Sequence, residues 1–207
     1  CIDKMTKVKI CGITNYEDAM DAVKLGADFI GLNFYRKVPR YIKLKEARKI
    51  ARDAPEKTKK VGIFVNSTLS NIKKISREIG LDYIQLHGNE SPEFCRQVKK
   101  STKKKIIKAI RVKSRRDLKK ISNFDVDFFI FDAYKKGHYG GTGKSIGFSL
   151  LKGVKKKYFL SGGLNPNNVK MAIKKLNPFV VDVSSGVEKS LGKKDHRKIK
   201  AFIDAVK

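Results

Sequence analysis

The chain alternates short apolar blocks of β type with segments of helical spacing, and this alternation limits its possible folds more than any other feature. Strands that alternate with helices form βαβ crossovers, and crossovers give a parallel sheet. Eight evenly spaced units predict a single-domain α/β protein, a closed (βα)8 TIM barrel, with an open doubly wound sheet as the alternative. The blocks start 21 to 32 residues apart, near Val8, Phe29, Val61, Tyr83, Lys105, Phe128, Tyr158 and Val180.

Helix start signals stand between these blocks. Asn15 and Ser70 each precede an amphipathic run, and Ser91-Pro92 and Asn165-Pro166 precede two more. Side-chain oxygens at such positions accept hydrogen bonds from the first free backbone N–H groups of a helix, and proline suits its first turn. We therefore expect helices to follow all four positions.

A faint internal repeat supports the barrel. Residues 25–34 read LGADFIGLNF and residues 79–88 read IGLDYIQLHG, two βα units apart. Repetition of one βα unit is how a closed barrel is built. We expect residues 1–207 to form one barrel domain, with residues 1–6 as a terminal extension.

The composition is strongly basic. Forty-eight Lys and Arg against 20 Asp and Glu give the 207 residues a formal net charge of +28. Such a charge can indicate nucleic-acid binding. Because the lysines lie in scattered tracts and no RNA- or DNA-recognition motif accompanies them, we favour a lysine-rich surface and no specific nucleic-acid partner. Such a field still favours the capture of small anions.

Other classes of protein are disfavoured by what the sequence lacks. No apolar run approaches the ~18 residues of a membrane span, and no signal-peptide core opens the chain. Three cysteines and three scattered histidines give neither a disulfide framework nor a metal-ligand spacing. We expect a cytoplasmic protein with no metal, no membrane association and no cofactor.

In a (βα)8 barrel the active site lies where the strands end. The two longest gaps between blocks follow the second and sixth strands, so residues 35–41 and 133–145 are expected to be functional loops. The predicted strand ends are Cys11, Asn33, Asn66, His87, Arg111, Asp132, Ser161 and Ser184.

Three glycine-bearing turns follow the last three strands, at residues 140–143, 161–163 and 184–186. Glycine lets backbone N–H groups approach an anion closely, and barrels commonly hold phosphate after strands seven and eight. The residues GGTGKS resemble a nucleotide P-loop, but His138 stands where that motif needs glycine. We expect a phosphate to bind Gly141, Gly143, Gly162, Gly163, Ser184, Ser185 and Gly186.

Two strand-end residues suit acid–base chemistry. Cys11 ends the first strand, and Lys9 points to the same side two residues earlier. A nearby ammonium lowers the pKa of a thiol, so we expect Cys11 to serve as a base. Asp132 follows four apolar residues, and a desolvated carboxyl there would keep its proton and act as an acid.

The chain resembles the phosphoribosylanthranilate isomerases, the (βα)8 enzymes of tryptophan biosynthesis. The resemblance runs from about Lys7 to the C-terminus, although Leu191 replaces a proline common in the family. The matching segments are VKICGIT (8–14), PRY (39–41), VGIFVN (61–66), QLHGNE (85–90), FD (131–132), GGTGK (140–144), SGGLNPNNV (161–169), VDVSSGVE (181–188) and GKKD (192–195).

The resemblance implies an Amadori rearrangement of N-(5-phosphoribosyl)anthranilate to 1-(2-carboxyphenylamino)-1-deoxyribulose 5-phosphate. It implies that Cys11 is the general base, Asp132 the general acid and Arg40 the residue that engages the anthranilate. His87 and Asp182 are expected to support substrate binding. The reaction needs no cofactor, and the enzyme is expected to be a monomer or a homodimer.

Two other functions remain open at this stage. Another phosphate-binding barrel, such as the sugar isomerase of histidine biosynthesis, is related in chemistry but has an aspartate where Cys11 stands. A basic nucleic-acid-binding protein is the non-enzymatic alternative.

Overall fold

Eight parallel strands close into a barrel in sequence order, which confirms the predicted (βα)8 architecture and excludes the open sheet. The computed structural model describes residues 5–133, 148–151, 153–154 and 156–207. The strands are β1 (Lys7–Cys11), β2 (Phe29–Asn33), β3 (Lys59–Phe64), β4 (Tyr83–Leu86), β5 (Lys105–Val112), β6 (Phe128–Ala133), β7 (Tyr158–Leu160) and β8 (Val180–Val183). Each observed strand begins within two residues of its predicted start.

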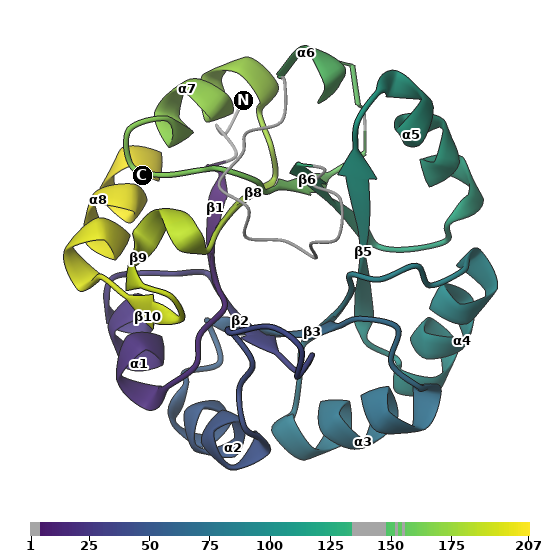
Figure 1. Ribbon diagram of the computed structural model, residues 1–207, viewed down its shortest axis with the longest axis horizontal. Coiled ribbons are helices and arrows are strands. Elements are labelled where there is room, and N and C mark those ends of the chain that lie inside the picture. Colours follow the sequence, from purple (N-terminus) through teal and green to yellow (C-terminus); the bar gives the residue numbers. More distant parts are fainter. Residues whose placement is uncertain (1–4, 134–147, 152, 155) are drawn as a thin grey trace.

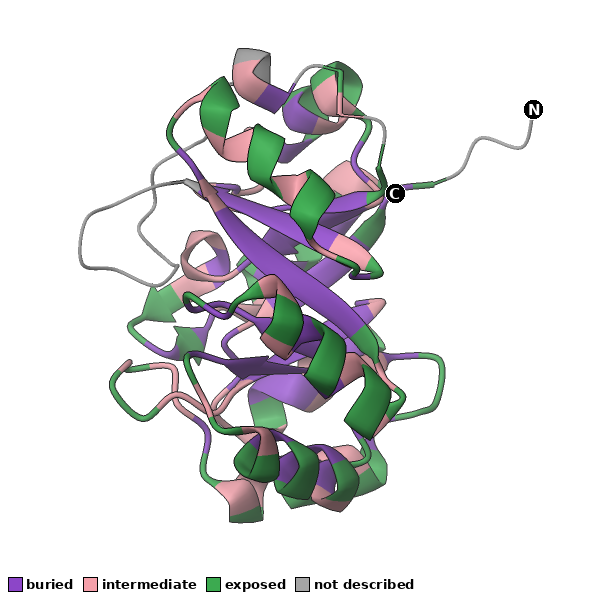
Figure 2. Cartoon of the chain, turned by 90° about the vertical axis from the view of Figure 1, so that its right-hand side faces the viewer, coloured by how far each residue is buried: buried purple, intermediate pink, exposed green. Residues whose placement is uncertain are grey.

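The helices form a ring around the barrel (Figure 1). They are α1 (Tyr16–Lys24), α2 (Leu44–Asp53), α3 (Leu69–Ile79), α4 (Pro92–Thr102), α5 (Arg115–Lys119), α6 (Phe148–Leu151), α7 (Val169–Leu176) and α8 (His196–Val206). Short 3-10 helices, η1 (Lys120–Asn123) and η2 (Ser185–Val187), follow α5 and β8. The strands are buried, while the helices are buried only on their inner faces (Figure 2).

The inside of the barrel is layered along its axis. At the base, Phe29, Tyr83, Phe159 and Val180 belong to a closed apolar cluster, and Phe29 packs edge-on against both other rings. Since alternate residues of a strand face the same side, the next inward layer carries Lys9, Gln85 and Asp182. The layer above it, at the strand ends, carries the candidate site.

Two of the expected helix starts are confirmed and two are shifted. The side chains of Asn15 and Ser91 accept from the backbone N–H groups of Asp18 and Phe94. Helix α3 starts at Leu69, before Ser70, because the Thr68 side chain caps it instead. Helix α7 starts after Asn168 rather than at Pro166, because Asn165 and Asn168 close a preceding turn through their side-chain oxygens.

A small antiparallel hairpin of β9 (Glu188–Ser190) and β10 (Lys193–Lys194) was not predicted. Its strands are too short for an alternating pattern to reveal them. The hairpin is fastened to the loop after β1 and to helix α1, because Thr14 Oγ1 donates to Gly192 O over 2.6 Å and Lys194 N donates to Asp18. The expected extension at residues 1–6 lies mostly outside the described residues and stays a prediction.

Candidate active site

A pocket of ≈ 590 Å³ opens at the carboxyl ends of the strands. The loop after β2 contributes residues 37–40, which places the first expected functional loop at the site. Two predicted strand-end residues do not line the pocket: Asn66 accepts a hydrogen bond from Asn89 N, and Arg111 donates to His87 O. The strand-end residues that line it are Cys11, Asn33, His87, Asp132, Ser161 and Ser184.

Cys11 belongs to a buried polar group that reaches across the barrel interior. Lys9 Nζ lies 3.4 Å from Cys11 Sγ, 2.9 Å from Gln85 Oε1 and 2.8 Å from Asp182 Oδ1. Lys9 is fully buried and Asp182 is 5% exposed. A buried carboxylate at this distance compensates most of the ammonium charge.

The expectation that Lys9 lowers the pKa of Cys11 is wrong in its net result. Burial of the thiol raises its pKa above the ordinary value, and the negative charge of Asp182 raises it further. Lys9 and Lys194 oppose these effects without overcoming them. The sequence argument missed Asp182 as the partner of Lys9, because only the closed barrel brings β8 beside β1.

Asp132 and His87 form a second buried group in the pocket. His87 Nε2 lies 3.5 Å from Asp132 Oδ2, and His87 Nδ1 lies 2.7 Å from Gln85 Nε2. Asp132 is 2% exposed. Because Gln85 touches both His87 and Lys9, its amide joins the acid side of the pocket to the thiol side. Gln85 was not predicted as a site residue, although a residue two positions before His87 is expected to point to the same side of the strand.

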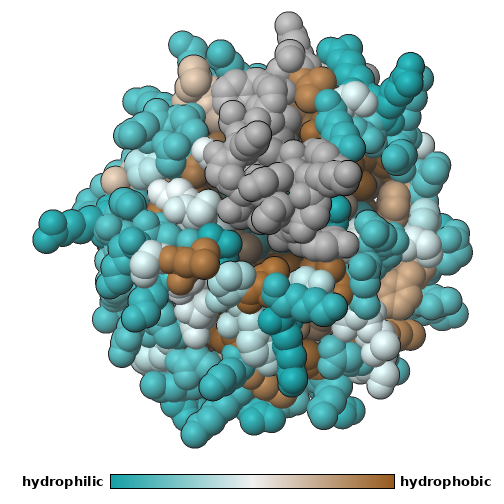
Figure 3. Space-filling view, viewed as in Figure 1, coloured by the Kyte–Doolittle hydropathy of each residue, from teal (hydrophilic) through white to brown (hydrophobic). Residues whose placement is uncertain are grey.

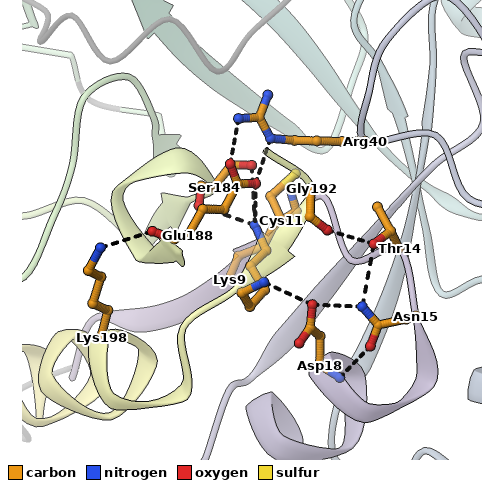
Figure 4. A network of polar contacts seen from close by, with 11 residues as sticks. Lys9, Cys11, Thr14, Asn15, Asp18, Arg40, Ser184, Glu188, Gly192 and Lys198 are labelled. Carbon is orange, nitrogen blue, oxygen red and sulfur yellow. Dashed lines mark hydrogen bonds and ion pairs between the residues drawn. The ribbon is translucent and has the colours of Figure 1, made fainter. Parts of the chain in front are cut away.

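Arg40 is held by a partner that the sequence argument did not identify. Its Nε and Nη2 atoms donate to the two carboxylate oxygens of Glu188 over 2.7 and 2.8 Å. Lys194 Nζ also bonds Glu188 over 3.1 Å, and Ser184 O over 3.1 Å. Figure 4 shows Arg40, Glu188 and Ser184 gathered beside Cys11. Glu188 lies in the segment VDVSSGVE and Lys194 in the segment GKKD, but the spacing of the two segments does not predict that these side chains pair.

The turns after β7 and β8 pack against each other. Gly162 and Gly163 have positive φ values of 95 and 68, a conformation that other residues rarely adopt. Gly186 has no room for a side chain, because a Cβ atom there would overlap Leu164 O. The pocket reaches these turns through Ser161 and Ser184. The other expected phosphate-binding residues, Gly141 and Gly143, lie outside the described residues.

This packing predicts the effect of Gly186→Ala. The added methyl group must push the two turns apart, so we expect KM for a phosphorylated substrate to rise at least about tenfold and stability to fall by about 1–3 kcal/mol. Gly80→Ala is the control, because the positive φ of Gly80 strains an alanine there while the space around it is open, and Gly80 does not line the pocket. It should lower stability without changing KM. Equal KM values in both variants would remove this turn from the phosphate site.

The fold and the pocket together define a (βα)8-barrel enzyme with a polar site at the carboxyl ends of its strands. The family whose pattern matches residues 8–205 is described as N-(5'phosphoribosyl)anthranilate (PRA) isomerase. The chain belongs to this family. No helix within the described residues is both long and apolar enough to cross a membrane.

Individual relatives agree with the family. The N-(5'-phosphoribosyl)anthranilate isomerase of Thermotoga maritima is 44% identical over 206 residues, covering 98% of this chain and 99% of that one. A crystal structure of monomers of the dimeric T. maritima enzyme matches with a TM-score of 0.87 and 40% identity over 98% of both chains. A phosphoribosylanthranilate isomerase in complex with reduced 1-(o-carboxyphenylamino)-1-deoxyribulose 5-phosphate matches with a TM-score of 0.86, also at 40% identity and 98% coverage of both chains.

Proposed function

We propose that this protein converts N-(5'-phosphoribosyl)anthranilate to 1-(2-carboxyphenylamino)-1-deoxyribulose 5-phosphate in tryptophan biosynthesis. Membership of the family supports the activity, and the complex of a relative with a reduced form of this product supports the substrate. The observation that carries the proposal is the pair of Cys11 and Asp132, which end β1 and β6 and line one pocket.

In the proposed reaction Asp132 donates its proton to the furanose ring oxygen. The bond between that oxygen and C1′ breaks, and the anthranilate nitrogen becomes part of a protonated Schiff base. The Cys11 thiolate then removes the C2′ proton, and the electron pair moves into the C1′–C2′ bond to neutralise the nitrogen. The enol that results tautomerises to the ketone, so no atom is gained or lost overall and no redox partner is consumed.

The remaining site residues are proposed to hold the substrate. Glu188 occupies two of the five N–H donors of Arg40, and we propose that the other donors, which bond no described residue, bind the anthranilate carboxylate. His87 and Asp182 are proposed to bind the sugar. The phosphate is proposed to bind at the two packed turns, through Gly162, Gly163, Ser184, Ser185 and Gly186, with Gly141 and Gly143 completing that set.

Growth of a bacterium that lacks its own phosphoribosylanthranilate isomerase tests this function. We expect the wild-type chain to restore growth without tryptophan, and Cys11→Ala to fail at equal protein abundance. A wild-type chain that is abundant and folded but gives no growth would contradict the proposal.

Nucleic-acid binding is the alternative that the charge raises. Hydrophilic residues lie all around the rim of the face seen in Figure 3, and the lysines are scattered along the chain rather than gathered in one segment. We therefore expect duplex DNA to bind weakly, without sequence preference, and to be released between low and physiological salt, because such binding rests on counterion release. A salt series in a filter-binding assay measures this. Tight, sequence-selective binding at physiological salt would overturn our interpretation of the lysines.

The partner is proposed to be this small molecule alone, without metal, cofactor, membrane or specific nucleic acid. We propose a cytoplasmic location, as for a biosynthetic enzyme. One solved relative is dimeric, and this chain is expected to be a monomer or a homodimer, which sedimentation equilibrium will decide.

A further inference from the structure

We propose that Lys194 supplies the uncompensated positive charge that stabilises the Cys11 thiolate. The inference rests on the proposed role of Cys11 as a base and adds a positioning residue to that site. Lys194 lies on β10, in the hairpin that the sequence did not predict, and its side chain is fully buried.

The charges around the Cys11 thiol do not cancel. Three cations and two carboxylates from four parts of the chain surround this side of the pocket. The described residues concerned are Lys9, Arg40, Lys194, Asp182 and Glu188. Their sum is one positive charge, which matches the single negative charge of a thiolate.

Pairing shows which cation is in excess. Lys9 and Asp182 lie 2.8 Å apart and are both buried, so they act on the thiol as a nearly neutral pair. Arg40 and Glu188 share two parallel hydrogen bonds, the strongest arrangement for such a pair. Among the described residues, the Lys194 ammonium then contacts a carboxylate that is already paired with Arg40 and the neutral oxygens of Ser184.

The other titratable groups nearby are also paired. On the β4 and β6 side, His87 and Asp132 lie 3.5 Å from each other. Behind the hairpin, Asp18 accepts from the backbone of Lys194 and contacts His196 Nε2 over 3.0 Å. Burial lowers the pKa of Lys194, and the negative charges of Glu188 and of the Cys11 thiolate oppose that shift. The positive charge of Lys194 in turn opposes the burial that raises the pKa of the Cys11 thiol.

Burial makes this one charge effective. Charges in a protein interior are screened far less than charges at the surface. Removing the Lys194 ammonium leaves two ion pairs around the thiol, and Lys9, whose charge is paired with that of Asp182, then opposes the desolvation that raises the pKa of the thiol. The neighbouring residue Lys193 is exposed, so its charge is screened by solvent.

Alkylation of Cys11 by iodoacetamide tests the proposal without requiring turnover. Only the thiolate reacts, so the rate as a function of pH reports the ionisation of the thiol. Peptide mass spectrometry follows Cys11 separately from the other cysteines. In Lys194→Met we expect the midpoint to move to higher pH by about one unit, which lowers the rate below the midpoint about tenfold. Lys193→Met, the matched control on the same strand, should leave the midpoint unchanged.

Two further variants separate charge from structure. Lys194→Met combined with Glu188→Gln restores the net positive charge and should return the midpoint toward the wild-type value. Lys9→Met combined with Asp182→Asn removes a neutral pair and should move the midpoint little. The proposal is overturned if the alkylation midpoint of Lys194→Met equals that of wild type. It is also overturned if the midpoint of Lys193→Met, or of Lys9→Met combined with Asp182→Asn, moves as far as that of Lys194→Met.

Turnover of N-(5'-phosphoribosyl)anthranilate is measured on the same preparations. If the wild-type chain does not turn over this substrate, the proposed function fails, while the alkylation profiles still decide the role of Lys194. If it turns the substrate over and Lys194→Met leaves the alkylation profile unchanged, only the present inference fails.

Discussion

Cys11→Ala is expected to lower kcat by ~10²–10⁴-fold, the usual contribution of a positioned base. The substitution removes the only group in our proposal that takes the C2′ proton. The barrel should stay folded, because Cys11 lies at the pocket and outside the apolar core. Steady-state kinetics measure the effect. Cys95→Ala is the matched control, because Cys95 is fully buried in the core behind the barrel and should affect stability rather than kcat.

The pH dependence of kcat/KM is a second test of Cys11 as the general base. The pKa of the thiol lies above its ordinary value, so the thiol is mostly protonated at neutral pH in the free enzyme. Raising the pH increases the thiolate fraction, and kcat/KM should therefore rise with pH through the neutral range. Near-normal turnover by Cys11→Ala, or a rate that falls as pH rises from 6 to 8, would show that another group is the base.

Asp132→Asn is expected to have an effect of the same order, ~10²–10⁴-fold on kcat. Asparagine keeps the shape of the side chain but has no acidic proton for the ring oxygen. Because the change is nearly isosteric, KM and the free energy of unfolding should change little. Kinetics and thermal unfolding of the same preparation separate the two effects.

Asp125→Asn is the control for this variant. Asp125 stands shortly before β6, is largely exposed and pairs with Lys99, so its loss should leave kcat unchanged. If Asp132→Asn keeps wild-type kcat, His87 becomes the better candidate for the acid, since it lines the same pocket.

The fold was predictable because a β-type block recurs eight times with segments of helical spacing between the blocks. Eight such units predict a closed barrel. Because barrel enzymes have their active sites at the carboxyl ends of the strands, the region of the site could also be predicted from the sequence. Short elements without a repeated pattern were not predictable. The β9–β10 hairpin spans only residues 188–194, and it carries Lys194, whose buried ammonium pairs with Glu188.

The electrostatics of the site were predictable only in part. The spacing of Lys9 and Cys11 on one strand correctly predicted their contact. The sign of the net effect was wrong, because burial of the thiol raises its pKa and because Asp182, 173 residues beyond Lys9, pairs with Lys9 and raises that pKa further. Local spacing predicts which residues of one strand meet. Pairing between distant strands requires the closed structure.

The most direct test of the central claim is the isomerase reaction itself. Purified protein is mixed with freshly prepared N-(5'-phosphoribosyl)anthranilate in the presence of a chelator, and the loss of anthranilate-type fluorescence is followed with time. The account predicts rapid loss of fluorescence with wild-type protein, with formation of the 1-deoxyribulose 5-phosphate product, and almost none with Cys11→Ala or Asp132→Asn. Folded wild-type protein that leaves the substrate unchanged, or variants as active as wild type, would contradict it.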